Sequence, residues 1–92
     1  MDPERKTAAI QFGKNLWRYR RRAGLSQEKL GFRTSLHRTE ISLLERGNRE
    51  PRLGTIVKLA SALTVSINML CEGTGWESKG RRPMIKNRDE DG

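Results

Sequence analysis

The sequence predicts an all-α domain of five helices, two of which form a helix-turn-helix. Two observations support this class. Apolar residues recur at intervals of three and four along successive stretches, and short segments rich in Gly, Ser, Asn or Pro separate these stretches. The second and third stretches are short and lie only a tight corner apart, which is typical of a helix-turn-helix. A chain of 92 residues has room for one compact domain with short ends.

The first helix is expected to begin at Ala8, after a polar and charged segment 1–7 that we expect to form a flexible N-terminal arm. Gly24 is typical of the residue that follows a helix C-terminus. One apolar stripe runs along this helix, formed by Ala9, Phe12, Leu16, Tyr19 and Ala23. The other faces are dense in Lys and Arg, which favours a nearby anion such as a phosphate. We expect Trp17 at the edge of the core, with stacking against a partner as the alternative.

The second and third helices are expected to meet at a corner over residues 34–36. Ser26 is a suitable N-cap for the second helix, which runs to about Arg33. The third helix runs from His37 to about Arg46 and is closed by Gly47. The residues of the helix-turn-helix that are expected to face the core are Leu30, Leu36, Ile41 and Leu44. Gly31 inside the second helix predicts a close approach of the backbone of the third helix.

The fourth and fifth helices follow a loop that ends at Pro51. The fourth is predicted to bury a stripe of Leu53, Ile56, Val57, Ala60 and Leu63. The fifth is short and is capped by Ser66. These helices complete a domain over residues 8–73, and residues 74–92 are expected to form a mostly disordered tail because they combine scattered Gly with mixed charge. Trp76 in that tail indicates docking on its own domain or across a dimer.

Charge and cysteine content narrow the function. Nineteen Lys and Arg against eleven Asp and Glu give a net charge of +8, which points first to nucleic acid and otherwise to a basic soluble surface. No apolar run approaches the roughly 20 residues of a membrane span, and no signal peptide precedes the domain, so we expect a cytoplasmic protein without membrane contact. The single Cys71 and the lack of a Cys and His cluster predict no metal and no cofactor.

Three segments carry a resemblance to a known family: GKNLWRYRRRAGLSQEKL, HRTEISLLERGNREP and LGTIVKLASALTVSINML. In this order and spacing they resemble the xenobiotic-response-element-like helix-turn-helix transcriptional regulators, which are related to the lambda and 434 phage repressors. The resemblance spans Phe12 to Gly73. It implies a five-helix lambda-repressor-like DNA-binding domain whose third helix enters the major groove. It also implies that Arg20 and Glu45 pair across the core.

The resemblance implies roles for single residues. Gln27 matches a glutamine that contacts a phosphate and braces the reading helix. Arg38 and Thr39 match positions that reach base edges, where an arginine suits guanine O6 and N7. Arg46 and Arg49 match phosphate contacts, which add affinity with little sequence information. The complete set of candidate DNA-binding residues is Gln27, Ser35, His37, Arg38, Thr39, Ser42, Leu43, Arg46 and Arg49.

Some positions leave two interpretations open. Leu43, beside the groove-facing Ser42, either contacts a thymine methyl or packs. Glu40 either accepts from a cytosine amino group or faces away from the phosphates. Ser35 stands where the family commonly has Gly, and a left-handed backbone there would cost about 1 kcal/mol. His37 replaces a usual capping Ser or Thr, so it either caps differently or approaches a phosphate or base.

We therefore expect a sequence-specific regulator of double-stranded DNA that acts as a repressor and binds an inverted repeat as a homodimer. The C-terminal helix, with Met69, Leu70 and Cys71, is the expected interface. The alternative is a protein-interaction module, antitoxin-like or polymerase-contacting, in which the tail docks a partner. An enzyme is not expected, because the sequence has no paired carboxylates, nucleophile and base arrangement or phosphate-binding glycine loop.

Overall fold

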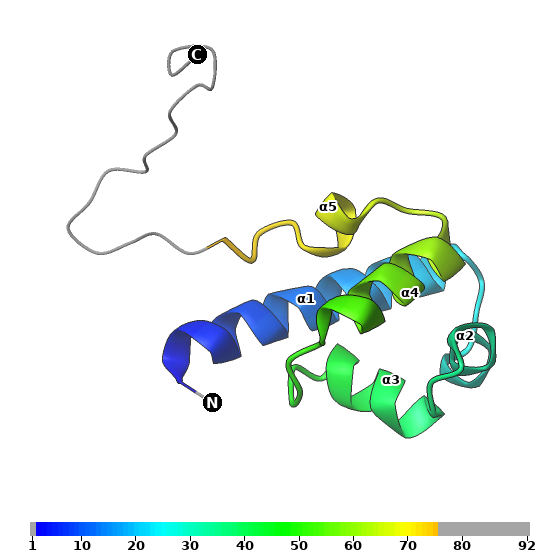
Figure 1. The fold of residues 1–92 in the computed structure, drawn as a ribbon, viewed down its shortest axis with the longest axis horizontal. Coiled ribbons are helices and arrows are strands. Elements are labelled where there is room, and N and C mark those ends of the chain that lie inside the picture. Colours follow the sequence, from blue (N-terminus) through cyan, green and yellow to red (C-terminus); the bar gives the residue numbers. More distant parts are fainter. Residues whose placement is uncertain (1, 76–92) are drawn as a thin grey trace, which may run out of the picture.

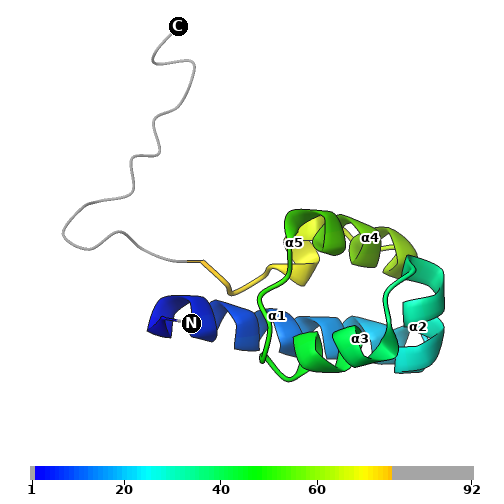
Figure 2. The same cartoon turned by 60° about the horizontal axis from the view of Figure 1, so that its bottom comes forward.

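A computed structural model describes residues 2–75 and folds them into five helices, with no strand in that range (Figure 1). The helices are α1 (Pro3–Arg22), α2 (Gln27–Thr34), α3 (Arg38–Glu45), α4 (Leu53–Leu63) and α5 (Ile67–Leu70). The predicted all-α class with five helices is confirmed. Helix α1 packs against α3 and α5, and α4 packs against α2 and α5, so the five helices enclose one core. Figure 2 shows α2 and α3 as a corner at one side of this core.

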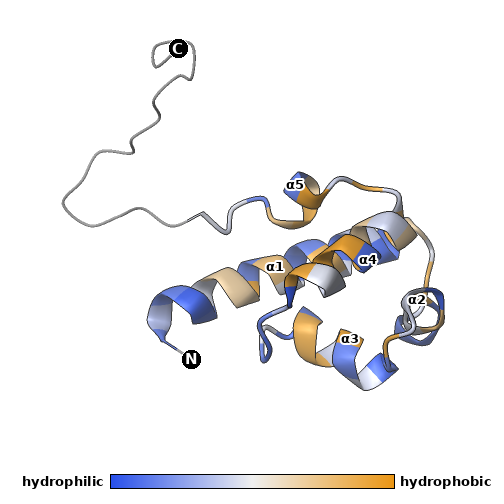
Figure 3. Cartoon of the chain, viewed as in Figure 1, coloured by the Kyte–Doolittle hydropathy of each residue, from blue (hydrophilic) through white to orange (hydrophobic). Residues whose placement is uncertain are grey.

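Every helix contributes to the core. The side chains that are completely buried are Leu16, Leu30, Ile41, Leu44, Leu59 and Leu70. Burial of each such side chain contributes roughly 1.5–3 kcal/mol relative to exposure. Figure 3 shows hydrophobic stretches along α4, whereas the beginning of α1 is hydrophilic. The predicted inward positions Leu30, Ile41 and Leu44 of the helix-turn-helix are confirmed as core residues.

Helix α1 begins five residues earlier than the apolar stripe predicts. The carboxylate of Asp2 caps the helix by accepting from the backbone N–H of Arg5 at 2.9 Å, and Pro3 occupies the first position, where its fixed φ suits a helix. The Arg5 guanidinium then pairs with Glu50 in the loop before α4 at 2.9 Å. The structure therefore places residues 3–7 in α1 instead of the flexible arm that we expected. Residue 1 of the predicted arm and residues 76–92 of the predicted tail 74–92, with Trp76, lie outside the described residues.

The buried stripe of α4 differs from the prediction. Leu53 and Val57 are 73% and 46% exposed, whereas Leu59, which we did not predict, is completely buried. The observed inner face consists of Ile56, Leu59, Ala60 and Leu63, at the spacing i, i+3, i+4 and i+7. Leu53 and Val57 lie at the edge of this face. Apolar periodicity alone does not specify which edge of the stripe on α4 is buried, because that depends on where α2 and α5 contact α4.

Two buried glycines allow close helix packing. A Cβ at Gly31 would lie 2.5 Å from the carbonyl oxygen of Leu36 in the corner and 3.4 Å from the backbone nitrogen of Arg38. A close backbone approach is therefore present, but it is made by the corner and by the first residue of α3 instead of by the body of that helix. A Cβ at Gly13 of α1 would collide with the carbonyl oxygen of Leu44 on α3. Any larger residue at Gly13 would push α3 away from α1, and overpacking of this kind costs roughly 1–3 kcal/mol.

Candidate nucleic-acid interface

The corner between α2 and α3 is built by local hydrogen bonds. Ser35 follows α2 with φ of 60°, in the left-handed region, so a residue with a side chain adopts the backbone conformation that glycine favours. The Leu36 N–H then donates to the carbonyl of Gly31 at 2.9 Å. His37 caps α3, since its Nδ1 accepts from the backbone N–H of Thr39 at 3.0 Å. Of the two open interpretations of His37, the structure therefore shows the capping role.

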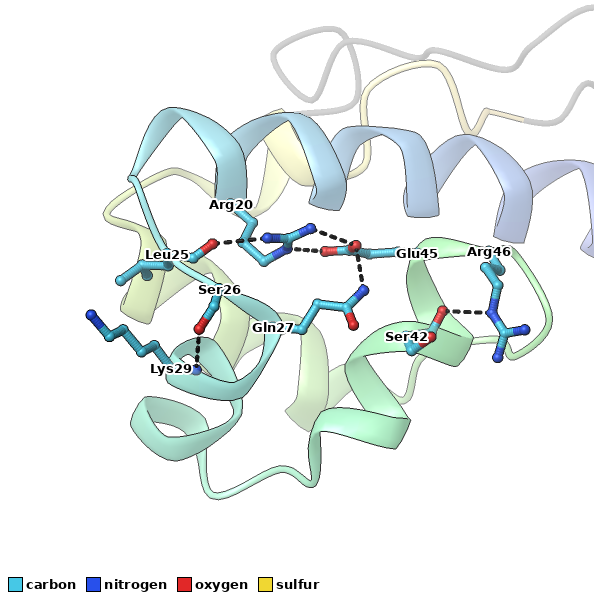
Figure 4. Close-up of polar contacts among 8 residues, drawn as sticks. All are labelled: Arg20, Leu25, Ser26, Gln27, Lys29, Ser42, Glu45 and Arg46. Atoms are coloured by element: carbon cyan, nitrogen blue, oxygen red, sulfur yellow. Dashed lines mark hydrogen bonds and ion pairs between the residues drawn. The ribbon is translucent and has the colours of Figure 1, made fainter.

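One side of α3 remains open to solvent. Ile41 and Leu44 are buried, while Arg38, Thr39 and Arg46 are exposed. Ser42 and Leu43 lie between these exposed residues and are partly exposed, because positions 38, 39, 42, 43 and 46 follow one side of a helix. We call these residues the α3 face. Figure 4 shows Ser42 and Arg46 next to each other, with the Arg46 Nε donating to the Ser42 carbonyl at 3.4 Å.

A buried ion pair fixes α3 relative to α1 and α2 (Figure 4). The guanidinium of Arg20 donates from Nε and Nη2 to the two carboxylate oxygens of Glu45 at 2.5 and 3.0 Å, and from Nη1 to the Leu25 carbonyl at 2.8 Å. The side chains of Arg20 and Glu45 are only 9% and 5% exposed. The structural pairing of these two residues is thus confirmed. Removal of one partner from such a pair typically costs about 3–5 kcal/mol, because the other charge stays buried.

Gln27, the first residue of α2, joins the same network. Its Nε2 donates to Oε1 of Glu45 at 3.0 Å, so the start of α2 and the end of α3 are held by one carboxylate (Figure 4). The structure therefore shows the contact by which Gln27 braces the reading helix. Its contact with a phosphate stays a prediction.

The loop after α3 is held by two further ion pairs. Arg49 donates to the carboxylate of Glu40, which lies at the edge of the α3 face, and the adjacent Glu50 pairs with Arg5 of α1. The structure shows that Glu40 has an arginine partner, and both interpretations of Glu40 toward DNA stay predictions. This pairing places Arg49 beside the reading helix.

An open basin of about 730 Å³ adjoins the α3 face where the end of α1 meets the start of α2. It is lined by Arg20, Arg21, Gly24, Leu25, Ser26, Gln27, Glu28 and Arg38. Glu45 neutralises Arg20, which leaves Arg21 and Arg38 as the cations of the basin and Glu28 as its carboxylate. The Ser26 hydroxyl accepts from the backbone N–H of Lys29, which leaves the N–H groups of Gln27 and Glu28 without an intrahelical partner, and such a helix start attracts anions. Cationic side chains at a helix start suit a phosphate.

Arg21 was not among the candidate residues. It lies over the ring of Trp17 at 5.3 Å from the centroid, a cation–π arrangement between residues four positions apart. Trp17 is 50% exposed, so it covers the outside of α1 more than the core edge where we expected it. The spacing of four residues between Trp17 and Arg21 predicts this contact, but the many arginines on α1 made Arg21 hard to single out from the sequence.

Within residues 2–75, no group of three or more His, Cys, Asp or Glu side chains is arranged to hold a metal ion. No helix in the same range is both long and apolar enough to cross a membrane.

Comparisons with known proteins agree with this geometry. Residues 18–70 match the helix-turn-helix family HTH_3. The chain is 45% identical over 53 residues to the control protein C.BamHI of Bacillus amyloliquefaciens, which covers 58% of this chain and 65% of that protein. It is 44% identical over 54 residues to an uncharacterized HTH-type transcriptional regulator of Sinorhizobium fredii, which covers 59% of this chain and 70% of that protein.

Solved structures show the same similarity. The restriction-modification controller protein C.AhdI from Aeromonas hydrophila matches with a TM-score of 0.67 and 39% identity over 70% of this chain and 97% of that chain. An HTH_3 family transcriptional regulator from Vibrio cholerae matches with a TM-score of 0.69 and 26% identity, over 72% of this chain and 37% of that chain. The family match covers the buried ion pair, the corner and the α3 face. This chain belongs to the HTH_3 helix-turn-helix family of DNA-binding transcriptional regulators.

Proposed function

We propose that this protein regulates transcription by binding a specific double-stranded DNA sequence with α3 in the major groove. The observation that carries the proposal is the fixed presentation of the α3 face: Glu45 ties α3 to both Arg20 of α1 and Gln27 of α2. A reading helix held at a fixed angle presents its side chains to base edges at constant positions, as sequence discrimination requires.

Individual contacts follow from side-chain chemistry. Arg38 donates to guanine O6 and N7, and Thr39 and Ser42 bond to bases one turn apart. Leu43 approaches a thymine methyl. Arg46 and Arg49 contact phosphates, with Arg49 released from or shared with Glu40. The basin at the start of α2 receives a further phosphate between Arg21 and Arg38.

We further propose a homodimer on an inverted repeat, because one short reading helix discriminates few base pairs and two copies one helical turn apart multiply the discrimination. The apolar residues exposed on α5 are Ile67 and Met69, at 42% and 39%. Leu70, which we expected in the interface, is completely buried in its own core, so Ile67 replaces it. Cys71, partly buried beside α5, has a pKa raised by burial, which keeps its thiol protonated at neutral pH.

The relatives suggest a biological setting. C.BamHI is a control protein, and C.AhdI controls a restriction-modification system. We propose that this chain likewise controls genes of a restriction-modification system, and that occupancy of its operator represses its own promoter. Repression needs only occupancy, which the α3 face and the dimer supply.

Selection of bound sequences from a random DNA pool, at about physiological salt, tests the proposal. An enriched inverted repeat with half-sites one helical turn apart is the expected result. On that site, Arg38→Ala should relax the preference at one base pair, at a cost of about 1–3 kcal/mol. Arg46→Ala is the matched control, since loss of a phosphate contact should weaken all sequences alike and reduce the salt slope by about 0.9. Binding without enrichment, which disappears as salt rises, would refute sequence-specific regulation.

A further inference from the structure

The most exposed large apolar side chain between residues 2 and 75 is Phe32, on the outside of α2, at 89%. Val57 of α4 is 46% exposed, and Leu53, one turn earlier on the same helix, is 73% exposed. Phe32 and Val57 line one open groove of about 830 Å³ between α2 and α4. We call this the α2–α4 groove. Neither the core nor the α3 face uses Phe32.

The groove is lined by the apolar Phe32, Val57 and Ala62 and by the polar Thr34, Ser35 and Ser61, and it has a cationic rim. The charged residues that line it are Arg33 and Lys58, both exposed, and no carboxylate lies among its lining residues. Exposed aromatic side chains of this kind are typical anchors of protein interfaces, whereas a solvated helix face would carry polar residues. The chemistry therefore fits a partner that places an apolar side chain against Phe32 and Val57 and carboxylates against the two cations.

Two other occupants fit less well. In a symmetric dimer the same patch faces its own copy, which would set Arg33 and Lys58 against the same cations of the second chain. DNA would neutralise the rim but would leave Phe32 and Val57 without an apolar partner. Of the nine candidate DNA-binding residues, only Ser35 borders this groove. The exposed apolar residues of α5 form a separate surface that does not line the groove.

We propose that the α2–α4 groove docks an acidic amphipathic helix of a partner protein. A groove between two helices suits a third helix that inserts side chains from one face. An apolar side chain of the partner lies between Phe32 and Val57, and its flanking carboxylates pair with Arg33 and Lys58. The regulator is thereby able to contact a protein through one surface while the α3 face contacts DNA. This inference does not depend on the identity of the operator.

Two synthetic peptides test the proposal with the full-length protein. Both are helices pre-organised by a side-chain cross-link, with the same apolar residues at i, i+3, i+4 and i+7. One carries Glu on both flanks of this stripe, and the other carries Lys. Fluorescence anisotropy at about 0.15 M salt should show at least tenfold tighter binding of the Glu peptide, and amide shifts in NMR should map to α2 and α4.

Variants make the test specific. Phe32→Ser should weaken the Glu peptide at least tenfold without changing thermal unfolding, since Phe32 is 89% exposed. Leu53→Ser, which removes an exposed apolar residue of α4 that does not line the groove, is the matched control and should leave the affinity unchanged. The double charge reversal of Arg33→Glu with Lys58→Glu should invert the preference so that the Lys peptide binds more tightly.

Several results would overturn the proposal. If the two peptides bind equally, or if neither binds, the groove does not select an acidic helix. A change in sedimentation of Phe32→Ser without peptide would assign the groove to a second copy, and a change in its DNA affinity would assign it to DNA. Peptide binding that occurs only after removal of residues 76–92 would assign the groove to that segment of the chain itself.

Discussion

Ser35 and Thr64 adopt a backbone conformation that favours glycine, although both residues carry a side chain. Their φ values are 60° and 57°, and they terminate α2 and α4 respectively. A Cβ in the left-handed region approaches the following carbonyl, which costs roughly 1–2 kcal/mol. Ser35 is exposed, so the side chain gains no compensating burial. The corner of the helix-turn-helix therefore retains strain that a glycine would relieve.

Ser35→Gly is expected to stabilise the domain by up to about 1 kcal/mol, because relief of this strain exceeds the entropy that a glycine adds to the unfolded chain. Denaturant unfolding followed by circular dichroism measures the change. Ser61→Gly is the matched control: Ser61 is exposed within α4, where the same substitution should destabilise by about 0.5–1 kcal/mol. Equal destabilisation by both substitutions would contradict the strain at Ser35.

Glu45 is a single residue that holds α3 in place within the candidate site. Its carboxylate accepts from both Arg20 and Gln27 and is almost completely buried. Because these donors come from α1 and α2, one side chain sets the position of α3 against both helices. The exposed pair of Arg5 and Glu50, with side chains 59% and 43% exposed, is more strongly screened by solvent and contributes far less to this rigidity.

At the scale of elements, the first turn of α1 depends on two carboxylates. The backbone N–H of Arg5 lowers the pKa of Asp2, and the Arg5 side chain lowers the pKa of Glu50. A carboxyl group whose pKa is lower in the folded state stabilises that state above its ordinary pKa, here 3.8 for Asp2 and 4.5 for Glu50. This stabilisation is lost as the pH falls through the lowered folded values.

Residues 3–7 are therefore expected to lose helicity as the pH falls below about 4, before the buried core unfolds. Carbon-13 Cα chemical shifts of these residues between pH 6 and pH 2.5 report the change directly. In Glu50→Gln, whose Arg5 contact no longer titrates, the remaining change should follow Asp2 alone. Loss of helicity at the same pH as the whole domain would show that the two carboxylates do not control this turn.

At the scale of the whole molecule, separate surfaces serve the proposed functions. The α3 face and the adjoining basin form the proposed DNA contact, α5 carries the proposed dimer contact, and the α2–α4 groove is a third surface. The net charge of +8 favours approach to DNA from any direction, so in this proposal specificity comes from the α3 face and from pairing of two copies.

Met69→Asp is expected to give a monomer in sedimentation velocity, because a desolvated charge replaces an apolar contact of the proposed interface. Its affinity for the inverted repeat should fall at least tenfold, while its affinity for one half-site should be unchanged. Leu53→Asp is the control, since Leu53 is 73% exposed on α4 and is not one of the residues of the proposed interface. A Met69→Asp protein that still sediments as a dimer would place the interface elsewhere.

Local chemistry explains what the sequence by itself determined. The number and order of the helices follow from apolar periodicity, and their ends follow from caps such as Ser26 and Ser66, whose hydroxyls accept from nearby N–H groups. Gly31 predicted a close backbone approach, which the structure places at the corner and at the first residue of α3. The membership of the α3 face also followed from sequence, because the outward side of an amphipathic helix is defined once its buried residues are known.

Contacts between distant segments were decided only by the tertiary structure. The edge of α4 that is buried depends on α2 and α5, and the pair of Arg5 and Glu50 joins residues 45 positions apart. Asn15, only 2% exposed, donates its amide to the carbonyls of Leu70 and Glu72 and holds the end of α5 against α1. Periodicity and caps describe neighbours along the chain, whereas these residues act on partners that only folding brings near.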